Sequence, residues 1–194
     1  MRPRENILVR VVVAIGAASV ILFFAAVGVM LATQHRASAK APDYRVLRIG
    51  GIEYESMQGR PLDLGDRVDR AIAAGLPAAQ RRLARGQILF GAFIAVTNDS
   101  SAPLRTADRI ELRDQHGHVY RPLALPAANP YAYSPRRLRP GTRIPALGSV
   151  ADDNLAATGR MLLFRIPAQT YAGAGLELVI HDPSSPASTA SLIV

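Results

Sequence analysis

The sequence predicts a mainly β protein, in which one N-terminal membrane-spanning helix is followed by an antiparallel β-sandwich with a short helical insertion. Three observations lead to this prediction. An uncharged apolar run covers residues 11–32, a helical apolar stripe covers about 66–85, and short apolar or alternating segments between Pro- and Gly-rich turns follow residue 86. Many short strands separated by such turns are typical of a sandwich.

The run at residues 11–32 reads VVVAIGAASVILFFAAVGVMLA and carries no charge. As a helix that rises about 1.5 Å per residue it is roughly 33 Å long, enough for a hydrocarbon core of about 30 Å. We therefore predict a transmembrane helix, with the lipid bilayer as its partner. Two alternatives stay open: a buried helix of a soluble domain, and a signal peptide cleaved at Ala37-Ser38-Ala39, although signal peptides usually have shorter apolar regions.

The flanks of this run predict its orientation. Residues 1–10 are short and basic, and residues 33–43 form a polar stalk without periodicity. Basic residues border the run on both sides, but long domains translocate regardless of their charge. We therefore predict a single-pass protein of the cell membrane, with residues 1–10 in the cytoplasm and the C-terminal domain extracytoplasmic.

Composition excludes several functions. Cysteine is absent, so the chain has no disulfide, no thiol nucleophile and no thiolate metal site. The formal net charge is +8, and half of it falls before residue 41, in the flanks of the apolar run. The remaining charge is mild and dispersed, which argues against nucleic acid as a partner.

The sandwich domain is predicted over residues 44–183, followed by a flexible tail over 184–194. Its first strands are expected at 44–49 and 52–54, because Gly50-Gly51 between them marks a turn. The tail is polar apart from its last three residues, 192–194, for which an edge contact stays open.

The helical insertion at about 66–85 follows these strands. Val68, Ile72 and Leu76 recur at helical spacing, and Asp66 is placed to cap the first turn. Gly75 and Pro77 interrupt the stripe, which predicts one short helix and then a turn or a second helical fragment.

After residue 86 the pattern is that of β-strands. Residues 88–98 are nearly all apolar, as in a central strand packed on both faces, and Gly91 indicates a bulge or close packing there. Apolar and charged residues alternate at 110–113, which predicts that Glu111 and Arg113 lie on an exposed face of a strand. Residues 114–118 form a hairpin loop, 119–122 the return strand, 123–150 a proline-rich crossing, and 159–167 and 176–181 the closing strands. Phe93, Leu112 and Phe164 are expected to share one core.

Several short motifs occur in a fixed order along this region. They are V-T-N at 96–98, I-x-L-x-D-x-x-G-x-x-Y-x-P at 110–122, N-P-Y at 129–131, L-x-P-G at 138–141, F-x-I-P at 164–167 and L-x-L at 176–178. Their order resembles the immunoglobulin-like domains of unknown function on small membrane-anchored proteins and lipoproteins of Gram-positive bacteria, especially actinobacteria. The resemblance covers about residues 86–182, and residues 50–85 depart from it. It implies an immunoglobulin-like fold at the cell surface and transfers no catalytic residue.

The search for chemistry gives one weak metal motif. His116 and His118 flank Gly117 in the hairpin loop, and their imidazoles suit copper or zinc. Further ligands would have to come from Asp114, Met161 or His181, whose positions the sequence does not give; otherwise this is an exposed turn in which Gly117 takes a positive φ. No Gly-x-Ser-x-Gly elbow or phosphate-binding loop occurs, so we predict no enzyme, no catalytic residue and no cofactor.

The most plausible binding surface is the stretch NPYAYSPRRLRPGTR at residues 129–143. Tyrosine and arginine are enriched where proteins bind partners, and guanidinium groups suit phosphate or carboxylate. The candidate partner-binding residues are Tyr131, Tyr133, Arg136, Arg137 and Arg139. We therefore predict a non-enzymatic interaction or envelope-assembly module whose partner is another envelope protein or an anionic envelope component. The alternative is an envelope metal-handling protein that uses His116 and His118.

Overall fold

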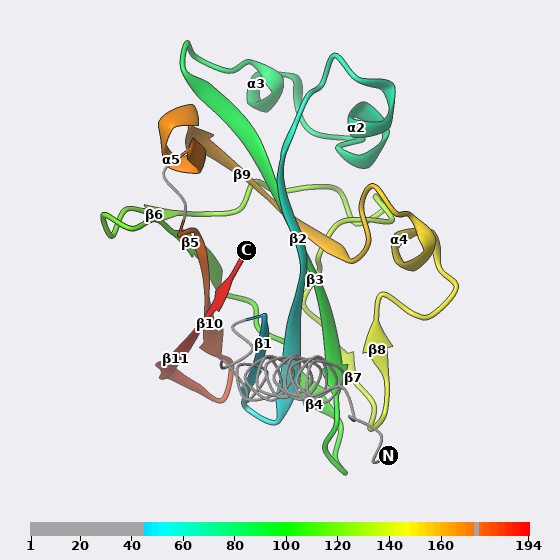
Figure 1. Ribbon diagram of the computed structural model, residues 1–194. Coiled ribbons are helices and arrows are strands. Elements are labelled where there is room, and N and C mark those ends of the chain that lie inside the picture. The colour runs from blue at the N-terminus through cyan, green and yellow to red at the C-terminus, as the bar shows by residue number, and fades with distance from the viewer. Residues whose placement is uncertain (1–44, 173–174) are drawn as a thin grey trace, which may run out of the picture. The chain divides into compact units, whose positions relative to one another are not determined.

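The computed structural model describes residues 45–172 and 175–194 (Figure 1). The predicted N-terminus at 1–10, transmembrane helix at 11–32 and stalk at 33–43 lie outside the described residues. Within the described ranges, no helix is both long enough and apolar enough to cross a bilayer. This part of the chain is mainly β, and its named strands pair in antiparallel sheets.

The first sheet is built around β3 (Gln87–Asn98), which confirms the strand predicted at 88–98. The strands run in the order β1-β2-β3-β8, and β9 also pairs with β3. Because β3 is long, β9 pairs along its first two thirds and β8 near its end. The other strands are β1 (Val46–Ile49), β2 (Ile52–Leu62), β8 (Arg143–Ile144) and β9 (Arg160–Pro167).

The second sheet has the order β11-β10-β5-β6. Its strands are β5 (Ile110–Arg113), β6 (Val119–Tyr120), β10 (Glu177–Asp182) and β11 (Ser185–Ile193). A separate two-stranded ribbon is formed by β4 (Leu104–Arg105) and β7 (Arg137–Leu138).

The prediction of a flexible tail at 184–194 is wrong, because most of this segment is β11. It pairs with β10, Leu192 is fully buried, and the amide of Val194 donates to the carbonyl of Leu176 at 3.1 Å. Its serine, alanine and threonine side chains are mostly exposed, so the strand is held chiefly through its backbone. A strand of that kind lacks the apolar alternation by which sequence analysis finds strands.

Two hydrophobic clusters lie on opposite faces of β3. The first joins residues of both sheets, among them Phe90, Leu112 and Phe164. The second contains Phe93 and Leu89 with residues from the helical insertion, the crossing and β9. The prediction that a central strand is packed on both faces is therefore confirmed.

The prediction that Phe93 shares one core with Leu112 and Phe164 is wrong. Side chains alternate between the two faces of a strand, and Phe93 has the opposite parity to Phe90. Gly91 lets the neighbouring strand pack closely: a Cβ on it would lie 3.0 Å from the Phe93 ring and 3.3 Å from Sδ of Met161.

The helical insertion contains α2 (Arg67–Ile72) and α3 (Ala78–Arg81), which confirms two short helical pieces (Figure 1). The carboxylate of Asp66 accepts hydrogen bonds from the amides of Val68 and Asp69, as predicted for a cap. Ile72 and Leu76 are buried in the second cluster and cover the outer face of the first sheet, whereas Val68, the first residue of the predicted stripe, is exposed. Two further helices, α4 (Val150–Asp153) and α5 (Ala168–Ala172), were not predicted.

Glu111 is buried rather than exposed, which corrects the prediction for β5; Arg113 is exposed as predicted. Arg109 Nε lies 3.2 Å from one carboxylate oxygen of Glu111, and Nε2 of His181 lies 3.3 Å from the other. Burial by itself raises the pKa of Glu111, but these two neighbours hold it below its ordinary value. The carboxylate of Glu111 is covered by the side chain of Arg109, two positions earlier in the chain, and by that of His181 on the paired strand β10. The alternation of residues along β5 alone does not show this cover.

Candidate functional site

Tyr131, predicted as a surface anchor, is buried in the second hydrophobic cluster. Its hydroxyl accepts a hydrogen bond from Nδ2 of Asn154 at 2.7 Å, and its amide donates to Oδ1 of Asn129 at 2.8 Å. The side-chain amide of Asn129 in turn donates to the carbonyls of Ile72 and Ala74. Tyr131 therefore ties the crossing to the helical insertion and offers little surface to a partner.

Tyr133 is also engaged within the protein. Its hydroxyl donates to the carbonyl of Ala107 at 2.6 Å, and the hydroxyl of Tyr54 accepts from the amide of the same residue at 2.7 Å. Burial raises the pKa of Tyr54 to about 12, and it also raises the pKa of Tyr133. Tyr54 and Tyr133 therefore stay protonated and serve a structural role. The two predicted aromatic anchors, Tyr131 and Tyr133, are both engaged within the protein and are not available for binding.

The three predicted arginines do lie at the surface. Arg136, Arg137 and Arg139 are exposed, and Arg137 in β7 is the register partner of the exposed Arg105 in β4. We call these four residues the arginine ribbon. Within residues 45–172 and 175–194, none of the four forms an ion pair. Like charges directly opposite on paired strands are destabilising unless an anion joins them.

The backbone of the ribbon is held by two buried side chains that sequence analysis missed. Asn98 donates from Nδ2 to the carbonyl of Leu138 at 3.0 Å and to that of Ala102 at 2.9 Å. The hydroxyl of Thr106 accepts from the amide of Arg136 at 3.0 Å. Both residues are fully buried, so the arginines project from a fixed backbone. The only sequence signal for this support was the position of Asn98, a polar residue at the end of an otherwise apolar strand.

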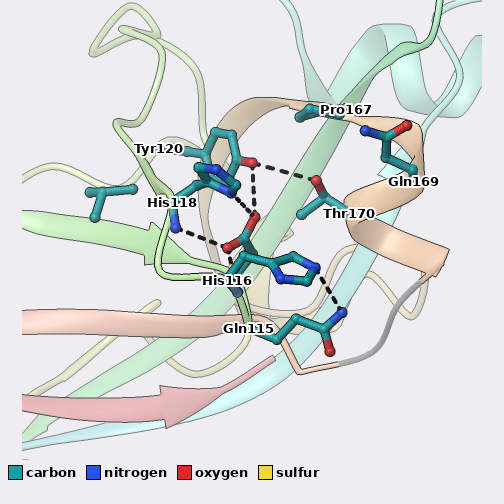
Figure 2. A pocket seen from close by; sticks show the side chains of 9 residues that line it. Gln115, His116, His118, Tyr120, Pro167, Gln169 and Thr170 are labelled. Carbon is teal, nitrogen blue, oxygen red and sulfur yellow. Dashed lines mark hydrogen bonds and ion pairs between the residues drawn. The ribbon is translucent and has the colours of Figure 1, made fainter.

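A pocket of about 560 Å³ lies between the β5–β6 hairpin and α5 (Figure 2). The hairpin contributes both predicted histidines, and the segment around α5 contributes Pro167, Gln169 and Thr170. Gly117 has φ +82° at the tip of the loop, which confirms the positive φ predicted there. The β5–β6 hairpin and the segment around α5, about 50 positions apart in the chain, thus line one pocket that is open to solvent. The sequence analysis did not predict this pocket.

Asp114 organises this pocket from beneath. It is 6% exposed, and its two oxygens accept from the amides of His116 and His118, from Nδ1 of His118 and from the hydroxyl of Tyr120. Burial by itself raises the pKa of Asp114, but these hydrogen bonds lower it to about 2. The carboxylate is therefore ionised and holds the hairpin in one shape.

The two histidine rings have centroids 6.2 Å apart. His181 is not near them, because it is paired with Glu111 across β10 and β5. Among the residues that the structure describes, no group of three or more His, Cys, Asp or Glu is arranged to hold a metal ion. The structure therefore brings together His116 and His118 but supplies neither Asp114 nor His181 as a further ligand.

Comparison with known proteins gives no family. No protein-family model matches the chain, and no curated protein matches it. Among solved structures, a conserved hypothetical protein from Bacillus anthracis is similar with a TM-score of 0.46 and 9% identity, over 77% of this chain and 92% of that one. The yjhA protein from Bacillus subtilis is similar with a TM-score of 0.43 and 11% identity, over 77% and 95%. Both likenesses are too low to assign a family or a function.

Proposed function

We propose that this protein is a single-pass membrane protein that presents an immunoglobulin-like sandwich outside the cytoplasm as a non-enzymatic interaction module. The observation that carries the proposal is the arginine ribbon, in which exposed cations face one another without a described acidic partner. An anionic group, either a carboxylate of another envelope protein or a component of the envelope, is the partner that this surface fits. Guanidinium groups bind both carboxylate and phosphate in two-point geometry.

The order of the strands supports the immunoglobulin-like part of the proposal. One sheet contains β2, β3 and β9, and the other contains β5, β10 and β11. The chain changes sheet after β3, returns to the first sheet between β6 and β8, and changes again after β9. Immunoglobulin domains place strands A, B and E in one sheet and C, F and G in the other. In the same scheme β6 is the additional strand beside C. This arrangement fits the resemblance of residues 86–182 to surface domains of Gram-positive bacteria.

The uncharged run at 11–32 supports the anchor. The expected behaviour is that the protein stays in the membrane fraction through a carbonate wash and keeps residues 1–40. In cells stripped of their wall, added protease should digest the C-terminal domain. A mature N-terminus at Lys40 would contradict the anchor, and a domain protected in cells but cleaved after lysis would reverse the orientation.

The binding surface is tested with the full-length protein in a zwitterionic detergent and with immobilised poly-L-glutamate as the anionic probe. The double variant Arg137→Gln/Arg139→Gln should bind about tenfold more weakly, because two ion pairs of about 0.5–1 kcal/mol each are lost. The matched control is Arg81→Gln/Arg82→Gln, which removes the same charge from exposed residues at the end of α3.

The control should change the affinity by less than about twofold, as expected for screened charges distant from the contact. Equal losses in the two double variants would mean that net charge, and not the arginine ribbon, attracts the probe. No binding by the unaltered protein would remove carboxylate as the partner chemistry of this surface.

A further inference from the structure

We propose that three residues of the arginine ribbon, Arg105, Arg137 and Arg139, form one site that binds a phosphate group in preference to a carboxylate. The inference rests on the function proposed above and narrows its partner chemistry from anions in general to phosphate. Its basis is the register of β4 and β7, the burial of the residues along them, and the number of oxygens that each anion offers.

The two-stranded ribbon has an inner and an outer face. Leu104 and Leu138 are register partners, and both pack in the first hydrophobic cluster. Because side chains alternate along a strand, the next register pair, Arg105 and Arg137, lies on the outer face. Both arginines are exposed, as this placement requires.

The side chains of Arg105 and Arg137 start close together. The amide of Thr106 donates to the carbonyl of Arg136 at 2.9 Å, so these two residues form a hydrogen-bonded pair. Hydrogen-bonded and non-hydrogen-bonded pairs alternate along an antiparallel ladder, which makes the adjacent Arg105–Arg137 pair non-hydrogen-bonded. Opposite Cβ atoms are about 4.5–5.5 Å apart, and non-hydrogen-bonded pairs are the closer kind.

Arg139 adds a third guanidinium to the outer face. It follows β7 directly and is exposed, whereas Leu138, between it and Arg137, is buried. Two positions of extended chain span about 6.6 Å, a gap that long arginine side chains bridge. Arg136 has the parity of Leu138 instead, and its Nε donates to the carbonyl of Ser134. Three of the four arginines of the ribbon therefore share one face.

The outer face has no acidic partner in the part of the chain that the structure describes, since no ion pair there involves the three arginines. Asp182 lines a small pocket with Arg105, but its carboxylate accepts from the amide and the hydroxyl of Ser184. Like charges on one face of paired strands repel one another. A bound anion relieves that repulsion.

The number of acceptor oxygens selects phosphate. A carboxylate has two oxygens and one charge, which a single guanidinium fork already satisfies. A phosphate monoester has three terminal oxygens and a charge of about −1.5 to −2 at pH 7. Each oxygen accepts from one guanidinium, so a phosphate group engages all three arginines at once.

The test is a calorimetric titration of the full-length protein at low salt with inorganic phosphate and, separately, with acetate. A maltoside detergent is used because its headgroup carries no phosphate. We expect phosphate to bind at least about tenfold more tightly than acetate. Equal affinities, or no binding of phosphate, would overturn the inference and leave the proposed function standing if poly-L-glutamate still binds. Failure of all three anions to bind would remove both.

Two neighbouring residues provide matched variants. Arg137→Gln removes a charge from the outer face, and Arg136→Gln removes the same charge one position earlier, outside that face. Arg137→Gln, and Arg105→Gln on the opposite strand, should each weaken phosphate binding about five- to tenfold, the loss of one charge-assisted contact. Arg136→Gln should change it less than about twofold, as for a screened charge outside the contact. All three side chains are exposed, so the fold is retained. Equal losses in Arg136→Gln and Arg137→Gln would overturn the shared face.

A lipid headgroup and a soluble compound offer the same phosphate chemistry, and competition distinguishes them. Phosphatidic acid in the micelle and glycerol 3-phosphate in solution are each added to the protein with bound inorganic phosphate. Stronger displacement by phosphatidic acid assigns the site to a lipid headgroup, and equal displacement assigns it to a soluble or polymer-borne phosphate. Displacement by neither would overturn the inference.

Discussion

The guanidinium of Arg60 in β2 donates a hydrogen bond of 2.6 Å to the carboxylate of Asp69 in α2. The amide of Asp63 donates to the other oxygen of the same carboxylate at 2.8 Å. Asp69 is 7% exposed, so this ion pair fastens the helical insertion to the first sheet from a sheltered position. Burial by itself raises the pKa of Asp69, and the contacts with Arg60 and Asp63 bring it below its ordinary value.

Asp69→Asn should therefore lower the free energy of unfolding by about 2 kcal/mol at pH 7, the usual cost of losing a hydrogen bond between charged groups. Since the folded-state pKa lies below the unfolded one, the contribution is complete above about pH 4 and is lost as the pH falls through the folded pKa. Urea unfolding of a fragment starting at Tyr44, the boundary of the compact unit, measures both effects.

The control for this prediction is Asp99→Asn. Asp99 also pairs with an arginine, Arg48, but both side chains are largely exposed. The exposed pair should contribute less than about 1 kcal/mol. Equal costs for the two variants, or a cost for Asp69→Asn that does not shrink in acid, would contradict the assignment of the buried pair.

Phe93→Ala should cost about 3–5 kcal/mol of unfolding free energy, because it leaves a cavity in the second hydrophobic cluster. Arg113→Ala on the exposed face of β5 should cost less than about 0.5 kcal/mol. The same urea experiment on the Tyr44 fragment compares them. Phe93 and Arg113 variants of similar stability would mean that the strand register is wrong.

Glu111→Gln should destabilise the fragment by about 1–2 kcal/mol, since it weakens charge-assisted contacts with Arg109 and His181. Arg113→Gln, two positions along the same strand and exposed, is the matched control. Thermal and urea unfolding measure both variants. If Glu111 were on a solvated face, as alternation alone predicts, the two variants would be equally stable.

Leu192→Ala should cost about 2–5 kcal/mol, because Leu192 is fully buried between the sheets. Ser191→Ala on the same strand should change stability by less than about 0.5 kcal/mol. Hydrogen exchange offers a second measurement: the amides of β11 should be protected to the same extent as those of β10. If Leu192→Ala left the free energy of unfolding unchanged and the amides of 185–193 exchanged rapidly, the segment would be the flexible tail that the sequence predicted.

Prediction from sequence worked best where one residue pattern controls one local feature. The nearly continuous apolar run at residues 88–98 predicted a central strand, and Asp66 before a helical stripe predicted a cap, since both depend on neighbours a few positions away. At the candidate sites the arginines were predicted to be exposed, and they are. The tyrosines between them were misplaced, because the hydrophobic clusters that receive Tyr131 and Tyr133 are built from distant segments.

The sequence by itself determined the mainly β class, the helical insertion, the positive φ of Gly117 and the absence of cysteine chemistry. Only the tertiary structure decided that β11 is a strand, that Glu111 is buried, and that Arg105 lies opposite Arg137. The physical reason is the range of the interactions. Periodicity and turns are set by steric and hydrogen-bonding preferences within a few residues, whereas these three features depend on backbone pairing and side-chain cover between segments far apart in the chain.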